Sequence, residues 1–257
     1  MLHKRIIGGC LAATLATLLL CDGSSPTKPD EGSDRGWTLT NNTLTDPDGT
    51  TYTTVLIGNQ LWTVQNLQTT RYRDGAAIAH LSDSAGWTGA TGGGYCYYDN
   101  DVANATRYGA LYNWHAVNTG KLAPAGWRIP DTTDWNTLRD YLIDNGYNHE
   151  FALAGSNAVG KALASQDDWA HDDRIGRIGN DPSSNNSSGF TGQPGGSRHY
   201  FRGFREQGEI GRWWSLTQGS VPNEACARYL QNGGRGLSQG DYDVRNGFSV
   251  RLVRDVH

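Results

Sequence analysis

The segment Gln231 to Asn246 (QNGGRGLSQGDYDVRN) gathers the side chains best suited to recognising a ligand. It lies between two predicted strands and combines amides, carboxylates, guanidinium groups and a tyrosine, a composition typical of binding loops on a rigid scaffold. Adjacent strand residues point to opposite faces, so Trp214 beside a core Trp213 is predicted to be exposed and able to stack on a sugar or a partner. The alternative is a solvated hairpin. The candidate ligand-binding residues are Trp214, Asn232, Arg235, Gln239, Asp241, Tyr242, Asp243 and Arg245.

Catalytic and metal-binding motifs are missing from the sequence. It contains no HExxH, Cys-x-x-Cys, Walker or Gly-x-Ser-x-Gly pattern. Glu224, Asp241 and Asp243 can supply only a few of the roughly six to eight oxygen ligands that calcium takes, and solvated loop carboxylates are the alternative. His171 and His199 lack a partner at ligand spacing. We therefore predict a protein that is not an enzyme, with no metal, no cofactor and no catalytic residue.

Two cysteines fall in the body of the chain, Cys96 and Cys226. In an exported protein this pair is a candidate for one long-range disulfide. Two buried free thiols are the alternative, because sequence separation does not show whether the two Cα atoms approach each other.

The N-terminus has the pattern of an export signal. Lys4 and Arg5 precede an uncharged apolar stretch from Ile6 to Leu20, which is shorter than the roughly 20 residues needed to cross a bilayer. The following Cys21 completes a Leu-Leu-Leu-Cys sequence similar to the site at which bacterial lipoproteins are cleaved and acylated. We predict a lipoprotein signal peptide at 1–21, lipidation of Cys21 and location in the cell envelope. An ordinary cleaved signal and secretion are the alternative.

Composition characterises the chain beyond the signal. Residues 22–36 have no aliphatic side chain and are predicted to be a disordered tether. Residues 37–257 are predicted to form one domain. The 34 Gly, 9 Trp and 12 Tyr against 1 Met and 5 Phe favour loops and short strands around an aromatic core. Without residues 1–21 the chain keeps 20 basic and 26 acidic residues, a net charge of −6, which argues against nucleic-acid binding.

The order of predicted elements indicates an α+β domain. Strands are predicted at Tyr52–Ile57, Leu61–Val64, Arg212–Ser215, Ala227–Leu230 and Phe248–Val253, the first two as a hairpin and the last able to join them in one sheet. The clearest helix begins at Asp131 or Thr132, repeats apolar residues through Trp135 and Leu138, and ends at Asn145. Weaker helices are predicted at Tyr108–Val117 and Phe151–Ala164, and long loops at Gly75–Gly94 and Asp172–Gly196.

Several segments occur together in an order typical of one known family. They are Asp48–Leu67 (DGTTYTTVLIGNQLWTVQNL), Tyr108–Val117 (YGALYNWHAV), Pro124–Leu138 (PAGWRIPDTTDWNTL), Gly189–Ser197 (GFTGQPGGS), Trp213–Thr217 (WWSLT) and Gly247–Asp255 (GFSVRLVRD). In order and spacing they resemble the Fibrobacter succinogenes major paralogous domain, over nearly the whole chain after the tether. The resemblance implies an exported bacterial protein, commonly a lipoprotein, and no established activity.

Two of these patterns, Pro124–Trp135 and Gly247–Arg251, also resemble the formylglycine-generating and C-type-lectin-like superfamily. That resemblance implies a C-type-lectin-like fold, with a small twisted antiparallel sheet, two flanking helices and a loop-rich C-terminal half. The chain departs from the superfamily's chemistry. Cys226 has no second cysteine near it, as the oxidases have, and Val221–Glu224 (VPNE) is out of register with the calcium-binding loop of lectins.

Our first hypothesis is a lipid-anchored surface binding or adhesion protein that recognises an extracellular protein or glycan through its C-terminal loops. A variant of it is the variable protein of a diversity-generating retroelement, with Gln231–Asn246 as the variable segment. An enzyme of the formylglycine-generating or glycan-cleaving kind is the alternative from another class. A structural envelope protein without a specific ligand is the third.

Overall fold

The computed structural model describes residues 38–39, 43–149, 153 and 155–256. The signal peptide at 1–21, Cys21 and the tether at 22–36 lie outside the described residues, so these remain predictions, as do the bounds of the 37–257 domain. No helix within the described ranges is long and apolar enough to cross a membrane.

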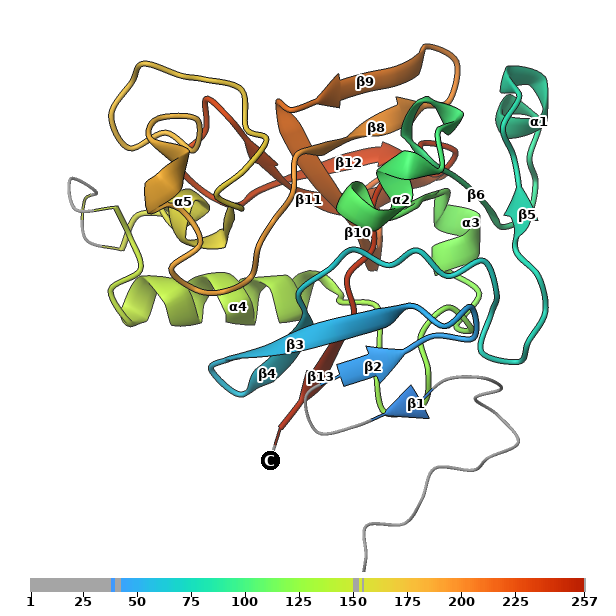
Figure 1. Cartoon of the computed structure of the whole chain (residues 1–257), viewed down its shortest axis with the longest axis horizontal. Helices are drawn as coiled ribbons and strands as arrows, with labels where there is room; N and C mark the ends of the chain where they lie inside the picture. Colours follow the sequence, from blue (N-terminus) through green and yellow to red (C-terminus); the bar gives the residue numbers. More distant parts are fainter. Residues whose placement is uncertain (1–37, 40–42, 150–152, 154, 257) are drawn as a thin grey trace, which may run out of the picture.

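The first sheet joins the two ends of the described chain (Figure 1). Its strand order is β1-β2-β3-β4-β13, made of β1 (Thr38–Leu39), β2 (Thr43–Thr45), β3 (Thr51–Ile57), β4 (Gln60–Thr63) and β13 (Val253–Asp255). The predicted hairpin is confirmed as β3 and β4, which turn at Gly58, where φ is +63°. Val253 pairs with Trp62 in antiparallel register, so the predicted pairing of a C-terminal strand with the N-terminal hairpin is confirmed. The predicted bounds of that strand, Phe248–Val253, were wrong, because β13 begins only at Val253.

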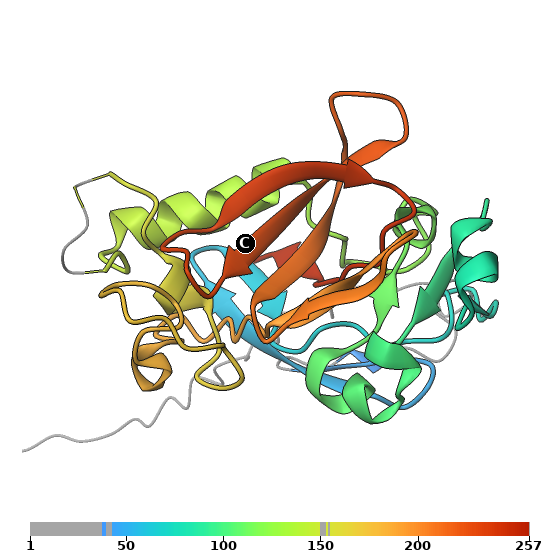
Figure 2. The same ribbon diagram turned by 90° about the horizontal axis from the view of Figure 1, so that it is seen from above.

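The second sheet is formed within residues 195–243 and has the strand order β12-β11-β10-β8-β9. Figure 2 shows its orange and red strands from above. Its strands are β8 (Gly195–His199), β9 (Gly203–Gln207), β10 (Ile210–Gln218), β11 (Glu224–Gln231) and β12 (Ser238–Asp243). The predicted strands at 212–215 and 227–230 are confirmed as the inner parts of β10 and β11. The expected loop-rich C-terminal half is found between α4 (Thr132–Asp144) and β8, where the described residues form only α5 (Gly160–Leu163) and η2 (Pro182–Ser184). Beyond Gly195 the expectation of loops was wrong. The edge strands β9 and β12 have half-buried or exposed side chains, so their polar sequences resemble loops.

A third, small sheet and several one-turn helices occupy one end of the molecule. They are β5 (Ala79–His80), α1 (Ser84–Thr88), β6 (Gly94–Cys96), η1 (Tyr98–Asn100), α2 (Ala103–Tyr108), β7 (Leu111–Tyr112) and α3 (Trp114–Val117). The predicted helix at 108–117 was wrong over its first half. Gly109 ends α2 at φ +75°, and Leu111 and Tyr112 are fully buried strand residues paired with β6. A short buried strand and a helix give the same apolar pattern.

The predicted long helix is confirmed as α4 (Thr132–Asp144). The Asp131 side chain accepts hydrogen bonds from the amides of Thr133 and Asp134, and Asp134 accepts in return from the amide of Asp131. This reciprocal cap satisfies amides that the first turn leaves unpaired. The predicted helix at 151–164 is reduced to α5 (Gly160–Leu163), and residues 150–152 and 154 lie outside the described residues.

The core has three clusters of buried side chains, and the two larger ones meet opposite faces of β10. Trp213 packs with Trp62, Trp135 and Phe190 beside α4, whereas the neighbouring Trp214 packs into a second cluster on the other face. In Figure 1 the β8–β12 sheet lies above the β1–β4 sheet, with α4 along one side. The fold is therefore a mixed α+β arrangement of three sheets, not the one small sheet that was expected.

A buried arginine connects these layers. Arg251 is fully buried and donates to Asn66 Oδ1 at 2.7 Å, to the carbonyls of Thr63 and Phe190 at 2.5 and 3.0 Å, and to the carbonyl of Thr191 at 2.8 Å. Burial lowers the pKa of Arg251, but the guanidinium stays charged at neutral pH because arginine is so strongly basic. The charge is thus held by backbone dipoles between β4 and the 190–191 loop.

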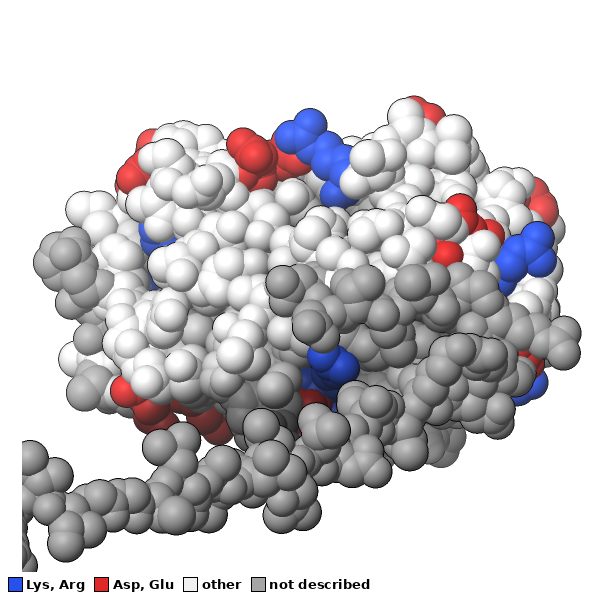
Figure 3. Space-filling view, turned by 60° about the horizontal axis from the view of Figure 1, so that its bottom comes forward, with Lys and Arg blue, Asp and Glu red and all other residues white. Residues whose placement is uncertain are grey.

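Charge is unevenly distributed over the surface. On the face brought forward in Figure 3, the described residues are mostly uncharged, and the Lys, Arg, Asp and Glu side chains are scattered, many of them near its margins. A mixed cluster of charged and aromatic residues occurs instead on the second sheet, where a pocket opens.

Candidate functional site

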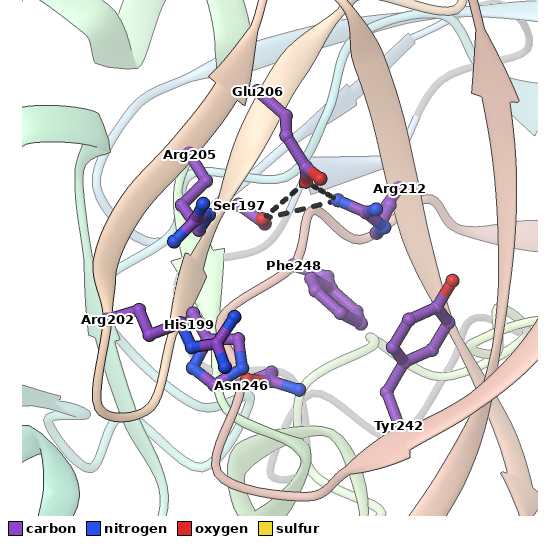
Figure 4. A pocket seen from close by; sticks show the side chains of 9 residues that line it. All are labelled: Ser197, His199, Arg202, Arg205, Glu206, Arg212, Tyr242, Asn246 and Phe248. Carbon is purple, nitrogen blue, oxygen red and sulfur yellow. Dashed lines mark hydrogen bonds and ion pairs between the residues drawn. The ribbon is translucent and has the colours of Figure 1, made fainter.

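A pocket of about 230 Å³ opens between the β8–β9 hairpin, β10, the end of β12 and the segment after it (Figure 4). Three arginines and one glutamate line it, so the pocket is positive although the whole chain has a net charge of −4. Its lining residues are Ser197, His199, Arg202, Arg205, Glu206, Arg212, Tyr242, Asn246 and Phe248.

The β8–β9 hairpin presents one wall of the pocket. Its turn ends at Gly203, which has φ +73°, a conformation that glycine adopts without strain. Glu206 has φ +67°, which is uncommon for a residue with a side chain. Arg205 and Glu206 both line the pocket, although consecutive side chains of a regular strand point to opposite faces. The unusual backbone at Glu206 accounts for this, and such strain is often found at functional sites.

An ion pair spans the pocket between β9 and β10. Glu206 accepts a hydrogen bond from Arg212 Nη1, which also donates to Ser197 Oγ at 3.3 Å. Burial tends to raise the pKa of Glu206, but the hydrogen bond and charge of Arg212 outweigh it and hold the pKa below its ordinary value. The Arg212 side chain is 11% exposed, and its buried Nε has no hydrogen-bond partner among the described residues.

Two aromatic rings form the floor and the second wall. Tyr242 and Phe248 meet edge to face, with ring centroids 5.1 Å apart and planes at 89°. The guanidinium carbon of Arg212 lies 5.5 Å from the Tyr242 ring centre and 5.7 Å from that of Phe248, within the range of cation–π attraction. Burial raises the pKa of Tyr242, so its hydroxyl stays protonated at neutral pH.

Two further side chains are fixed as hydrogen-bond donors. Asn246 Oδ1 accepts from the amide of Tyr200 at 3.1 Å, which leaves its NH₂ group directed toward the pocket (Figure 4). His199 Nδ1 accepts from the amide of Phe201 at 3.3 Å, so a neutral ring has its proton on Nε2. Burial lowers the pKa of His199.

The charged groups around His199 shift its pKa in opposite directions. After burial, Arg202 and Arg205 lower the pKa of His199, whereas Asp243 and Glu206 raise it less. The net shift is downward. The ring is therefore neutral at pH 7 and gains a positive charge only in more acidic solution.

Three of the residues predicted from sequence lie at or beside the pocket. Tyr242 lines it directly. Asp243 accepts from Arg245 Nε at 2.9 Å and from Nη2 at 2.6 Å, and the Arg245 guanidinium lies 4.0 Å from the Tyr200 ring centre. The ion pair of Asp243 and Arg245 thus packs against Tyr200 at the tip of the β8–β9 hairpin. Of these three predicted residues, Tyr242 is the one that lines the pocket.

Four other predicted residues lie elsewhere. Asn232 and Arg235 are in the β11–β12 turn, where their side chains donate to the carbonyls of Ala170 and Ile175. Gln239 is exposed, and Asp241 accepts from the amide and hydroxyl of Ser220 at 2.9 and 2.6 Å. Gln239 and Asp241 are on the face of β12 opposite to Tyr242, since side chains alternate along a strand. The predicted set therefore does not form one site.

The predicted exposure of Trp214 was wrong. Its side chain is fully buried, its Nε1 donates to the carbonyl of Tyr112 at 2.8 Å, and its ring centre lies 4.4 Å from that of Phe248. β10 is a central strand with a core on each face, so Trp213 and Trp214 point in opposite directions and both are buried. Trp214 supports the pocket floor from below and offers no surface for stacking.

The two cysteines are free and buried. Cys96 packs with Trp87 and Leu111, whereas Cys226 is on β11. Burial raises the pKa of both thiols to about 11. The disulfide prediction was wrong, and the alternative of two buried thiols is what the structure shows.

The acidic residues considered for calcium do not form a cluster of ligands. Within the part of the chain that the structure describes, no group of three or more His, Cys, Asp or Glu side chains is placed to hold a metal. Asp241 is engaged by Ser220, and Asp243 by Arg245. Glu224 pairs with Asp243 across the β11–β12 ladder.

Sequence reasoning missed most of the pocket. One signal was present in His199–Glu206 (HYFRGFRE), which alternates aromatic and basic residues around a glycine and has the pattern of a hairpin with a functional tip. Arg212, Ser197 and Phe248 carry no such signal. They reach the pocket only because β8 and β10 pair in parallel and the last segment bridges to Trp213 through Ser249.

Fold and pocket define an α+β protein with a cationic, aromatic surface pocket. The sequence profile of the Fibrobacter succinogenes major domain matches residues 55–254, and the chain therefore belongs to this family. The resemblance to that family is confirmed, and it indicates a surface-type paralogous domain protein. No curated protein and no solved structure matches the chain.

Proposed function

We propose that the protein is an exported, lipid-anchored recognition protein of the cell envelope. It binds an extracellular protein or glycan in the pocket between the β8–β9 hairpin, β10 and the end of β12. The observation that carries this proposal is the convergence of Arg212, Tyr242 and Phe248 with the β8–β9 hairpin around one cavity. Concave sites with aromatic walls and a few placed polar groups are the usual form of a ligand site.

The order of the pocket supports binding. Glu206 and Ser197 hold the guanidinium of Arg212, and Trp214 packs beneath Phe248. Side chains fixed before the ligand arrives lose little conformational entropy when it binds, which favours affinity. The family indicates a surface-type domain, and a surface domain can present such a pocket to ligands outside the cell.

In this proposal the protein is a binding protein, not an enzyme. Glu206 is the one carboxylate among the lining residues, and the guanidinium of Arg212 engages it. Glycoside hydrolysis in its usual form requires a second carboxyl group across the cleft. The Ser197 hydroxyl also lines the pocket, but the hydrogen bonds given for it among the described residues join it to Glu206 and Arg212, and none joins it to the His199 ring that would have to activate it as a nucleophile.

The anchoring part of the proposal rests on the sequence Leu18–Cys21 and on the tether at 22–36. Metabolic labelling with palmitate in the native host tests it. We expect label in the parent protein and none in a Cys21→Ser variant. Equal labelling of the two proteins excludes Cys21 as the anchor.

We also propose that the fold is C-type-lectin-like. The Pro124–Trp135 and Gly247–Arg251 patterns support this assignment, and so does the antiparallel pairing of β4 with β13. An experimentally determined structure, compared with lectin-like domains strand by strand, tests it. A different order of the strands that surround α4 overturns the assignment.

Binding itself is tested with the purified protein on a glycan array and in pull-downs from cell surfaces, with calcium and with a chelator. Tyr242→Ala removes a pocket wall, and Gln239→Ala, on the opposite face of the same strand, is the matched control. We expect saturable binding that Tyr242→Ala abolishes and Gln239→Ala preserves. Binding that both variants retain places the site elsewhere, and no binding to any class refutes the recognition role.

A further inference from the structure

We propose that the pocket selects a sugar residue that carries a carboxylate, as in an acidic glycan, an inference that rests on the proposed function and specifies its ligand. The side chains around the cavity supply many hydrogen-bond donors, an excess of positive charge and an aromatic floor. A uronic acid residue offers the complementary groups.

The excess positive charge comes from two unpaired guanidinium groups. Arg202 and Arg205 are exposed on the hairpin wall, and neither forms an ion pair with a carboxylate among the described residues. Arg202 instead lies over the Phe201 ring at 5.0 Å. By contrast, the neighbouring Arg212 and Arg245 are both paired within the protein. Arg202 and Arg205 are therefore free to bind an incoming carboxylate, whose geometry matches a guanidinium fork.

Neutral donors reinforce this preference. The NH₂ group of Asn246 is turned toward the cavity because its oxygen accepts from the Tyr200 amide, and His199 presents Nε2–H because its Nδ1 accepts from the Phe201 amide. A ligand that fills the pocket must supply acceptors for these groups, since a donor left unpaired on desolvation costs binding energy.

The remaining groups favour a sugar over a peptide end. Tyr242 and Phe248 offer an aromatic corner, which suits the apolar face of a pyranose ring. Glu206 and the hydroxyls of Ser197 and Tyr242 can accept hydrogen bonds, as sugar hydroxyls require. A uronic acid residue combines a carboxylate, donating and accepting hydroxyls and an apolar ring face in one unit.

The test is calorimetric titration of the purified full-length protein with an oligouronate and with the same oligosaccharide after methyl esterification. The variant is Arg202→Gln/Arg205→Gln. Arg235→Gln, an exposed arginine in the β11–β12 turn, is the matched control. Circular dichroism verifies that each variant is folded. We expect the parent to bind the acid at least about tenfold more tightly than the ester, since hydrogen bonds to charged groups are the stronger ones. The double variant should lose this preference, and Arg235→Gln should keep it.

Further arms separate the sources of the anion. An oligosaccharide that carries sulfate esters and no carboxylate, or a peptide with a free C-terminal carboxylate, overturns the assignment if it binds as tightly as the oligouronate. Equal binding of acid and ester also overturns it, while loss of that binding in Tyr242→Ala upholds the proposed recognition site. If neither oligosaccharide binds and Tyr242→Ala does not weaken any interaction found on the arrays, the inference and the proposed function both fail.

Discussion

Replacing Arg251 with leucine should destabilise the fold far more than an ordinary surface substitution. The guanidinium is fully buried and donates to Asn66 Oδ1 and to the carbonyls of Thr63, Phe190 and Thr191. Asn66 Oδ1 also accepts from Trp213 Nε1 at 2.8 Å, so the arginine is part of a buried polar network.

The magnitude is set by the acceptors that the substitution leaves unpaired. A hydrogen bond to a charged group contributes about 1.5 to 3 kcal/mol, and removing one partner of a buried charge typically costs about 3 to 5 kcal/mol. Leucine removes the desolvation cost of the guanidinium, which offsets part of this loss. We therefore expect the free energy of unfolding to fall by about 4 kcal/mol, a large part of the roughly 5 to 15 kcal/mol of a typical domain.

Urea unfolding, followed by tryptophan fluorescence in the presence of a reductant, measures the change. Arg254→Leu is the matched control. Arg254 is half-buried, lies 5.3 Å from the Trp127 ring centre and has an Nε without a partner among the described residues, so its loss should cost about 1 kcal/mol or less. Equal losses in the two variants would refute the network argument.

The pocket histidine, the α4 cap and the buried thiols each lead to a further prediction. Protonation of His199 adds positive charge to the pocket, so the affinity for an acidic ligand should rise as the pH falls from about 7 to 5. The variant His199→Gln should bind with an affinity that changes little over this range, and a parent protein whose affinity is also independent of pH would contradict the prediction. Asp131→Ala removes the α4 cap and should cost about 1 kcal/mol in urea unfolding; no change would show that the cap is dispensable. Cys96 and Cys226 should resist maleimide in the native protein and react in denaturant, because both thiols are buried; rapid native labelling would contradict their burial.

Local signals predicted the elements that depend on nearby residues. Asp131 and Asn145 bound α4 as expected, because capping uses side chains within one turn. The β3–β4 hairpin was predicted from β-branched residues around Gly58. The pairing of β4 with β13 was also foreseen, since strong strand signals lie at both ends of the domain.

The pocket could not be predicted in the same way. Trp214 has the sequence environment of an alternating strand, and only the position of β10 between two cores makes it buried. Tyr242 was identified from the composition of its segment. That Tyr242 and Gln239 point to opposite faces could be predicted only if the segment was known to be a strand, β12. Arg205 lines the pocket together with Glu206 because of a positive φ that the residue type does not signal. Pairing between distant segments decided each of these cases.

The most direct test of the recognition site is the ratio of dissociation constants for Tyr242→Ala and Gln239→Ala with one ligand identified on the arrays. The two side chains lie on opposite faces of β12, and Tyr242 alone of the two lines the pocket. Burying a large aromatic side chain in an interface commonly contributes more than about 2 kcal/mol. We therefore predict at least about thirtyfold weaker binding for Tyr242→Ala than for Gln239→Ala. Equal affinities, or a larger loss for Gln239→Ala, would contradict the assignment of the pocket as the binding site.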